Sequence, residues 1–168
     1  LRAQDQEAKV EISSKPNQVS AGDQRKFDYF FYEGLNLKAA GKFDAAYDAF
    51  NHCLTIDSTA SAVLYELSSF YAQLNRPEKS LEMFGEASDE YEKLVKDYPG
   101  KPELNYYLAD ALTQEGEIGK AIDAYDALES SIGMSEALSM QKYKLYNALE
   151  QNDNAFKEVE KLAAKFPM

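Results

Sequence analysis

A spaced pattern of large apolar and small residues recurs along this chain in the same order, with identical spacing in its first two copies. The first copy consists of Phe30, Gly34, Leu37, Gly41, Phe43, Ala46, Phe50 and Cys53. The second consists of Leu64, Ser68, Tyr71, Asn75, Pro77, Ser80, Phe84 and Ala87. The third, from its second position on, consists of Ala109, Leu112, Gly116, Ile118, Ala121, Tyr125 and Leu128. Repeats that contact only their neighbours stack into a curved array, whose surface usually binds a partner and rarely holds a catalytic pocket.

The spacing of the apolar residues predicts helices from Asp23 onward, because they recur every three or four positions between turn signals. The predicted helices cover residues 24–40, 43–56, 59–74, 77–98, 101–115, 118–131, 134–150 and 153–166. Gly41 and Gly116 are expected to take the left-handed conformation that ends a helix. Pro77 and Pro102 fit a first helical turn, where no backbone donor is needed.

The spacing and residue types resemble the tetratricopeptide repeat family over residues 24 to 167. The resemblance implies an all-α fold, a right-handed α-solenoid of antiparallel helix pairs with about eight helices in four repeats. The expected repeats are about 27–60, 61–101, 102–135 and 136–168, within one helical domain 24–168. The small residues Gly34, Ser68 and Ala109 are expected where two helices cross closely. Residues 1–23 are rich in Ser, Pro and Gly and are expected to be extended or disordered.

Two repeats depart from the pattern. The second is longer than the first, and we predict one continuous helix over 77–98, because the added length is close to two helical turns and keeps the apolar face in one direction. In the fourth, Lys142 and Tyr143 stand where Leu and a small residue belong. Either its first helix is shifted in register, or the repeat is a terminal cap.

Composition excludes several classes of function. A net charge of −11 and a pI near 4.6 argue against nucleic acid and anionic membranes, which need clustered Lys and Arg. No stretch reaches the roughly 20 apolar residues that a membrane helix requires. Cys53 is the single cysteine, so no intrachain disulfide or cysteine-based zinc site is expected. No glycine-rich phosphate loop or metal-ligand spacing occurs, so no cofactor or metal is expected.

The first residues, Leu1-Arg2-Ala3-Gln4, are compatible with the end of a cleaved secretory signal. We therefore expect a periplasmic or secreted protein rather than a cytoplasmic one.

The family resemblance also implies a binding surface, because the first helix of each pair lines a concave groove in that family. The groove residues carried over to this chain are Asp28, Phe31, Leu35, Lys38, Tyr65, Ser69, Gln73, Glu103, Tyr106, Asp110 and Gln114. Phe31, Tyr65 and Tyr106 share one position and are expected to form an aromatic row. Such a row suits peptide binding. The alternative is that the rings pack between helices as interior residues.

Some family members hold a chaperone's C-terminal carboxylate through Lys, Asn and Arg at these positions. That charge clamp is missing here, where the positions hold residues such as Phe31, Tyr65 and Asp110.

Phe27, Tyr29, Phe30, Phe31 and Tyr32 put five aromatic residues into six positions, more than one helix face can bury. They are either an edge that contacts a partner or residues 1–23, or a surface left partly open by truncation.

His52 and Cys53 are adjacent on a helix and point about 100° apart, so they form no catalytic dyad. Cys53 is expected to be a buried small residue, with His52 on the solvent side.

We interpret the chain as a non-catalytic protein–protein interaction module that binds a peptide or partner protein in an acidic, aromatic-lined groove. The alternative is a structural subunit or self-associating scaffold of a larger assembly, possible for a cell-envelope protein, that makes contacts through its repeat ends.

Overall fold

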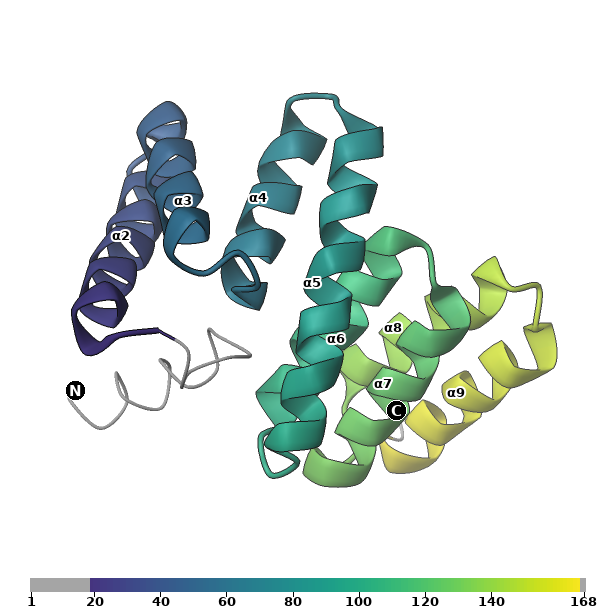
Figure 1. Ribbon diagram of the computed structural model, residues 1–168. Coiled ribbons are helices and arrows are strands. Elements are labelled where there is room, and N and C mark those ends of the chain that lie inside the picture. The colour runs from purple at the N-terminus through teal and green to yellow at the C-terminus, as the bar shows by residue number, and fades with distance from the viewer. Residues whose placement is uncertain (1–18, 167–168) are drawn as a thin grey trace. The chain divides into compact units, whose positions relative to one another are not determined.

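The computed structural model describes residues 19–166, and these residues contain only helices and turns. The elements are α2 (Ala21–Ala39), α3 (Phe43–Ile56), α4 (Ser61–Gln73), α5 (Pro77–Asp97), α6 (Pro102–Glu115), α7 (Ile118–Ile132), α8 (Glu136–Ala148) and α9 (Asn152–Lys165) (Figure 1). The predicted all-α fold is confirmed, and every helix boundary lies within three residues of its predicted place.

The helices pack as consecutive pairs, α2 with α3, α4 with α5, α6 with α7 and α8 with α9. They form two compact units that divide between Asp97 and Tyr98. Within the first unit α4 also packs on α3, and within the second α8 packs on α7. Within each unit, a helix pair therefore buries its apolar face partly inside the pair and partly against the other pair of that unit.

The first helix begins earlier than predicted. Residues 21–23 belong to α2, because the hydroxyl of Ser20 accepts a hydrogen bond of 3.1 Å from the backbone N–H of Asp23 and caps the helix. The prediction that residues 21–23 are extended is therefore wrong. The part of that prediction that concerns residues 1–18 lies outside the described residues.

The helices of the first three pairs come close at the predicted small residues. A Cβ atom added to Gly34 would lie 2.6 Å from the ring of Phe50 on α3. In the second pair, the hydroxyl of Ser80 donates a hydrogen bond of 3.0 Å to the carbonyl oxygen of Ser68 and so joins α5 to α4. In the third pair Ala109 is fully buried. The backbones come this close because no larger side chain separates them.

The turn inside each helix pair contains one residue in the left-handed conformation. These residues are Gly41, Asn75, Gly116 and Glu150, with φ values of 76°, 57°, 92° and 59°. The prediction for the two glycines is confirmed. Glu150 follows Gly116 by the same interval that separates Asn75 from Gly41, so the fourth repeat keeps the register of the third.

The buried residues of α8 support the same register. Leu138, Lys142 and Leu145 are buried, as are Leu104, Leu108 and Ala111, which stand one such interval earlier on α6. The interpretation that the first helix of the fourth repeat is shifted is therefore wrong.

The long helix α5 is continuous from Pro77 to Asp97, as predicted, and it passes through Gly85 without a break. Its buried residues include Phe84, Ala87, Tyr91 and Leu94. Because these residues follow the spacing of three or four positions throughout, the two extra turns keep the direction of the apolar face.

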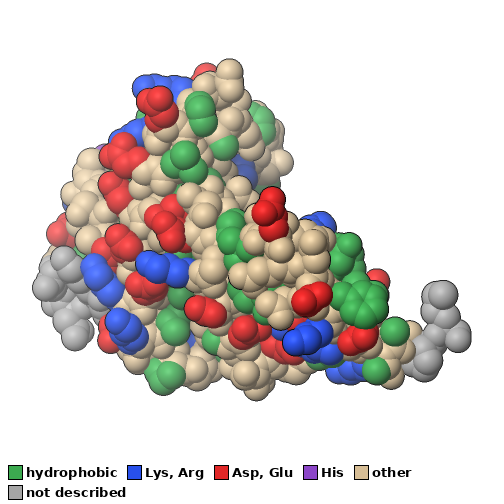
Figure 2. Space-filling view, turned by 90° about the vertical axis from the view of Figure 1, so that its right-hand side faces the viewer, with side chains coloured by type: hydrophobic (Ala, Val, Ile, Leu, Met, Phe, Trp, Pro, Cys, Tyr) green, Lys and Arg blue, Asp and Glu red, His purple; other side chains and the backbone are tan. Residues whose placement is uncertain are grey.

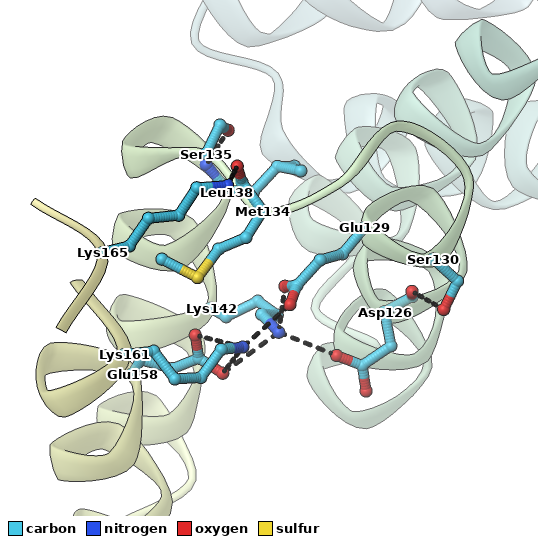
Figure 3. Close-up of polar contacts among 10 residues, drawn as sticks. All are labelled: Asp126, Glu129, Ser130, Met134, Ser135, Leu138, Lys142, Glu158, Lys161 and Lys165. Atoms are coloured by element: carbon cyan, nitrogen blue, oxygen red, sulfur yellow. Dashed lines mark hydrogen bonds and ion pairs between the residues drawn. The ribbon is translucent and has the colours of Figure 1, made fainter.

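A cluster of charged residues explains how a lysine replaces leucine in the core of the fourth repeat. The ammonium group of Lys142, only 3% exposed, lies 2.6 Å from a carboxylate oxygen of Glu129 and 3.0 Å from oxygens of Asp126 and Glu158 (Figure 3). Lys161 bridges Glu129 and Glu158 at 2.8 and 3.3 Å. We call these five residues the Lys142 cluster. They join α7, α8 and α9 in the place where other repeats use apolar contacts.

Candidate functional site

The predicted aromatic row begins with a ring that is not on the surface. Phe31 is 7% exposed, and its ring lies 6.2 Å from that of Phe27 and 6.1 Å from that of Phe50, between ring centroids. Phe31 thus packs inside the first helix pair. For this ring the alternative holds, in which the aromatic residues pack between helices as interior residues. The prediction that it lines an open groove is wrong, because the adjacent Gly34 lets Phe50 come close enough to cover it.

Two charged groove residues of α2 already have partners within the first unit. The ammonium group of Lys38 lies 2.6 Å from a carboxylate oxygen of Glu66 on α4. Asp28 is buried and accepts a hydrogen bond of 2.9 Å from the side-chain amide of Gln24. Leu35 is half-buried. The predicted groove residues of α2 therefore offer little side-chain surface for a ligand.

The middle of the row is partly open. Tyr65 is half-buried and packs edge-on against Phe84 of its own pair, with the ring centroids 5.8 Å apart. Ser69 is half-buried and its hydroxyl donates to the carbonyl oxygen of Tyr65 at 3.4 Å, whereas Gln73 is exposed. Tyr65 can therefore present one edge of its ring to a ligand, and Gln73 can present its amide.

The predicted groove residues of α6 are the most accessible ones. Tyr106 is 51% exposed, Glu103 and Gln114 are exposed, and Asp110 is half-buried. We call these four residues the α6 face. They lie on one side of a helix at intervals of three or four residues, so an aromatic ring is flanked along the helix by hydrogen-bonding groups.

The α6 face rests on a buried tyrosine of its helix pair. Burial raises the pKa of Tyr125 to about 12, with a further increase from the charge of Asp110, while a hydrogen bond with Thr113 acts in the opposite direction. Tyr125 is therefore a neutral, buried phenol at all physiological pH values. It supports the α6 face from the interior of the helix pair.

The five-residue aromatic run splits between core and surface. Phe27 and Phe31 are buried, Phe30 and Tyr32 are half-buried, and Tyr29 is 64% exposed. Phe30 lies against His52, with 4.0 Å between ring centroids. Helix α2 therefore buries two of the five rings and leaves the others partly or largely exposed, as expected for a run that one helix face cannot bury.

An apolar surface on α9, which was not expected from the sequence, lies at the other end of the chain. Phe156, Val159 and Phe166 of α9 are 60%, 41% and 49% exposed. The repeat spacing could have identified it, because Phe156 corresponds to Tyr47 of α3, whose ring packs against Phe70 of the following helix at 6.3 Å. In α9 this surface is open.

Cys53 has the environment of a core residue. It is fully buried, and its thiol lies 3.6 Å from the carbonyl oxygen of Phe27, to which it donates. Burial raises the pKa of this thiol to about 12, and the charge of Asp28 adds to the effect. The prediction of a buried cysteine with an exposed His52 beside it is confirmed.

We expect Cys53 to react with a thiol reagent such as dithionitrobenzoate only after unfolding, because a buried thiol with a raised pKa supplies no thiolate at neutral pH. Absorbance at 412 nm, followed with and without denaturant (~6 M guanidinium, enough to unfold a typical domain), measures this. Rapid reaction of the native protein would contradict the burial of Cys53.

On the face that Figure 2 shows, acidic side chains are spread widely, with basic side chains between them. Within residues 19–166, no group of three or more His, Cys, Asp or Glu side chains is arranged to hold a metal ion. None of the helices in the same residues has both the length and the apolar character to span a bilayer.

Comparison with known proteins identifies the type of repeat. Residues 81–135 match the family model described as tetratricopeptide repeat. No curated protein matches the sequence.

Several solved structures share the fold. The chain is similar to a crystal structure of MamA, with a TM-score of 0.55 and 22% identity over 80% of this chain and 74% of that one. Another MamA structure has a TM-score of 0.59 and 15% identity over 83% and 78% of the two chains. The first TPR of Spaghetti (RPAP3), bound to the HSP90 peptide SRMEEVD, has a TM-score of 0.54 and 16% identity over 79% and 97%. At these identities the likeness concerns the fold alone.

Proposed function

We propose, from the premise that this chain is a tetratricopeptide repeat protein, that it is a non-catalytic module that binds a peptide or a segment of a partner protein. The observation that carries the proposal is the α6 face, where Tyr106 is half exposed between exposed Glu103 and Gln114. A half-exposed aromatic ring offers a large contact area at a small cost in side-chain entropy. The flanking carboxylate and amide groups can hydrogen-bond the backbone of an extended or helical peptide.

The charge of the surface favours a basic or neutral partner. The RPAP3 structure holds an acidic peptide, SRMEEVD. In this chain the positions at which some family members carry a charge clamp include Tyr106 and Asp110 of α6, and Lys38 of α2 is already paired with Glu66. A net charge of −11 accelerates the association of basic segments, and this rate advantage decreases as the salt concentration rises.

The experiment starts with the purified chain immobilised as bait and the captured protein identified and purified. We expect Tyr106→Ala to weaken binding of that partner by about 2 kcal/mol, roughly 30-fold, because a buried aromatic anchor usually costs this much to remove. Tyr29→Ala is the matched control, since Tyr29 is an even more exposed tyrosine on another helix. Titration calorimetry measures both variants.

If wild-type protein and Tyr106→Ala bound a captured partner with equal affinity, the α6 face would not be its binding surface. A loss of equal size in Tyr29→Ala would show that exposed tyrosines act without regard to position.

The second candidate function is a subunit of a larger assembly that makes contacts through a repeat end. The exposed Phe156, Val159 and Phe166 of α9 favour it, because the equivalent surface of α3 is covered by the next helix. Sedimentation analysis over a range of concentrations distinguishes the two candidates. Association that rises with concentration and disappears in Phe156→Glu supports the assembly, and a monomer at all concentrations supports the peptide-binding module.

A further inference from the structure

The two compact units of this chain are related by an internal repeat that is two helix pairs long. Gly116 follows Gly41 by the same interval by which Glu150 follows Asn75, and all four residues have the left-handed conformation. Helices α3, α4 and the start of α5 therefore correspond to α7, α8 and the start of α9. Residues around the turn between α4 and α5 thus have counterparts around the turn between α8 and α9.

In the first unit two of the chain's own side chains contact the tyrosine at this place, Tyr71. The hydroxyl groups of Tyr47 and Tyr71 form a hydrogen bond of 2.9 Å. The guanidinium group of Arg76 lies over the ring of Tyr71, 5.7 Å from its centroid. A cation over the face of an aromatic ring is attracted by the ring's quadrupole, so Tyr71 is already occupied on that face.

In the second unit both of these contacting side chains are replaced. Tyr146 corresponds to Tyr71, but Ile122 replaces Tyr47 and Gln151 replaces Arg76. The side chains leave a cavity of about 580 Å³ whose lining includes Ile122, Asp123, Asp126, Tyr146, Leu149 and Gln151. We call it the Tyr146 cavity. The ring of Tyr146 keeps its place in the repeat and has lost the arginine of its counterpart.

The replacements around the cavity also reverse its charge. Three cations of the first unit, Lys42, Arg76 and Lys79, correspond to Glu117, Gln151 and Asn154. Asn51 corresponds to Asp126, whereas Asp123 keeps the carboxylate of Asp48. Three replacements act in the opposite direction, because Lys120 replaces Ala45, Lys142 replaces Leu67, and Gly119 in place of Asp44 removes one carboxylate. The residues that line the cavity are thus net acidic, whereas their counterparts in the first unit, which include an arginine, are net basic.

The carboxylates lie close enough to Tyr146 to act on it. Burial raises the pKa of the Tyr146 hydroxyl, and the charges of Asp126 and Asp123 raise it further, while Lys142 opposes them. One carboxylate oxygen of Asp126 lies 3.0 Å from Lys142, and its other oxygen points away from that lysine (Figure 3). A second cation could therefore approach Asp126 and Asp123 from the side of the cavity.

We propose that the Tyr146 cavity binds an arginine side chain of a partner protein. The guanidinium group stacks on the ring of Tyr146, as Arg76 does on Tyr71, and hydrogen-bonds the carboxylates of Asp123 and Asp126. Arginine is preferred over lysine because its planar group can stack and form two parallel hydrogen bonds to a carboxylate. This inference rests on the proposed function and gives it a specific contact.

The test uses the full chain and a blocked arginine, N-acetyl-arginine methylamide, followed by amide chemical shifts in NMR. We expect the largest shifts in residues 119–126 and 146–151. Asp123→Asn should weaken binding about threefold or more, as loss of one charge-assisted contact does. Asp48→Asn is the matched control, because Asp48 holds the same exposed position in the first unit, where Arg76 already occupies the site. The citrulline analogue, which has the same shape without the charge, should not bind.

A second variant fills the cavity. Gln151→Arg restores the arginine found in the first unit, so its own guanidinium group should lie over Tyr146 and abolish binding of the blocked arginine. Shifts that spread over the acidic surface and persist in both Asp123→Asn and Gln151→Arg would overturn the proposal. If a partner's affinity fell in Tyr106→Ala but not in Asp123→Asn, the proposed role of the Tyr146 cavity would be wrong and the proposed function would still hold.

Discussion

Replacing Lys142 by alanine is expected to lower the free energy of unfolding by about 3–5 kcal/mol, the usual cost of breaking a buried ion pair from one side. Lys142 is 3% exposed and contacts Asp126, Glu129 and Glu158. Without its ammonium group, Glu129 and Glu158 face each other across the core with only Lys161 between them. Urea denaturation followed by circular dichroism measures the change.

Lys144→Ala is the control for this prediction, because Lys144 lies on the same helix and is exposed. A surface substitution of this kind changes stability by about 0.5 kcal/mol or less. If Lys142→Ala and Lys144→Ala were equally stable, the Lys142 cluster would contribute nothing to the fold.

The repeats also indicate how to compensate for the loss. The residues that correspond to Lys142 are Leu67 and Leu108, and those that correspond to Glu158 are Met83 and Ala124. A variant that combines Lys142→Leu, Glu158→Ala and Glu129→Gln should recover most of the stability, because an apolar core of similar volume often equals a buried ion pair.

The Lys142 cluster makes stability depend on acid pH. Burial raises the pKa of Glu129, but hydrogen bonds from Lys142 and Lys161 outweigh this effect and leave the pKa below its ordinary value of 4.5. A lowered pKa in the folded state contributes stability above 4.5 that is lost as the pH falls through the folded value. The urea concentration at the midpoint of unfolding should therefore decrease as the pH is lowered below 4.5. The decrease should be less steep in Lys142→Ala.

Gly34→Leu is expected to destabilise the protein by about 3 kcal/mol, at the upper end of the usual range for overpacking a core. A Cβ atom alone at this position would lie 2.6 Å from Cε1 and 2.9 Å from Cδ1 of Phe50. Phe50 is fully buried against Phe31 and Phe70, so its ring has no free space into which to move. The thermal midpoint of unfolding reports the loss.

Gly119→Ala provides the matched control for Gly34. Gly119 is also a helical glycine, but an added Cβ atom there has nothing within 4 Å. Alanine favours helix over glycine by roughly 0.5–1 kcal/mol, so this variant should be as stable as the wild type or more stable. If Gly34→Leu left the midpoint unchanged, the close crossing of α2 and α3 would be refuted.

The sequence alone determined the repeat spacing, the positions of the turns and the small residues at the crossings. These features are local, because a left-handed turn requires a residue such as Gly41 and a close crossing requires one such as Gly34. The continuity of α5 was predictable for the same reason, since two whole turns preserve the direction of an apolar face.

The sequence predicted which helix face carries the candidate site. It did not predict how exposed each side chain on that face is. Phe31 and Tyr106 occupy the same position of their repeats, yet one is 7% exposed and the other 51%. The difference arises from the neighbouring side chains, because Phe50 and Phe27 cover Phe31. Burial depends on residues far apart in the sequence, which a repeat pattern does not specify.

Tertiary structure alone decided how the fourth repeat is held and where the Tyr146 cavity lies. Lys142 appeared in the sequence as a departure from the pattern, and its partners Asp126 and Glu158 lie on the helices before and after its own. The cavity likewise depends on Ile122 of α7, Tyr146 of α8 and Gln151 of the turn that follows α8. Ion pairing and cavity formation require atoms to meet within a few ångströms in space, and only the packed helices bring them together.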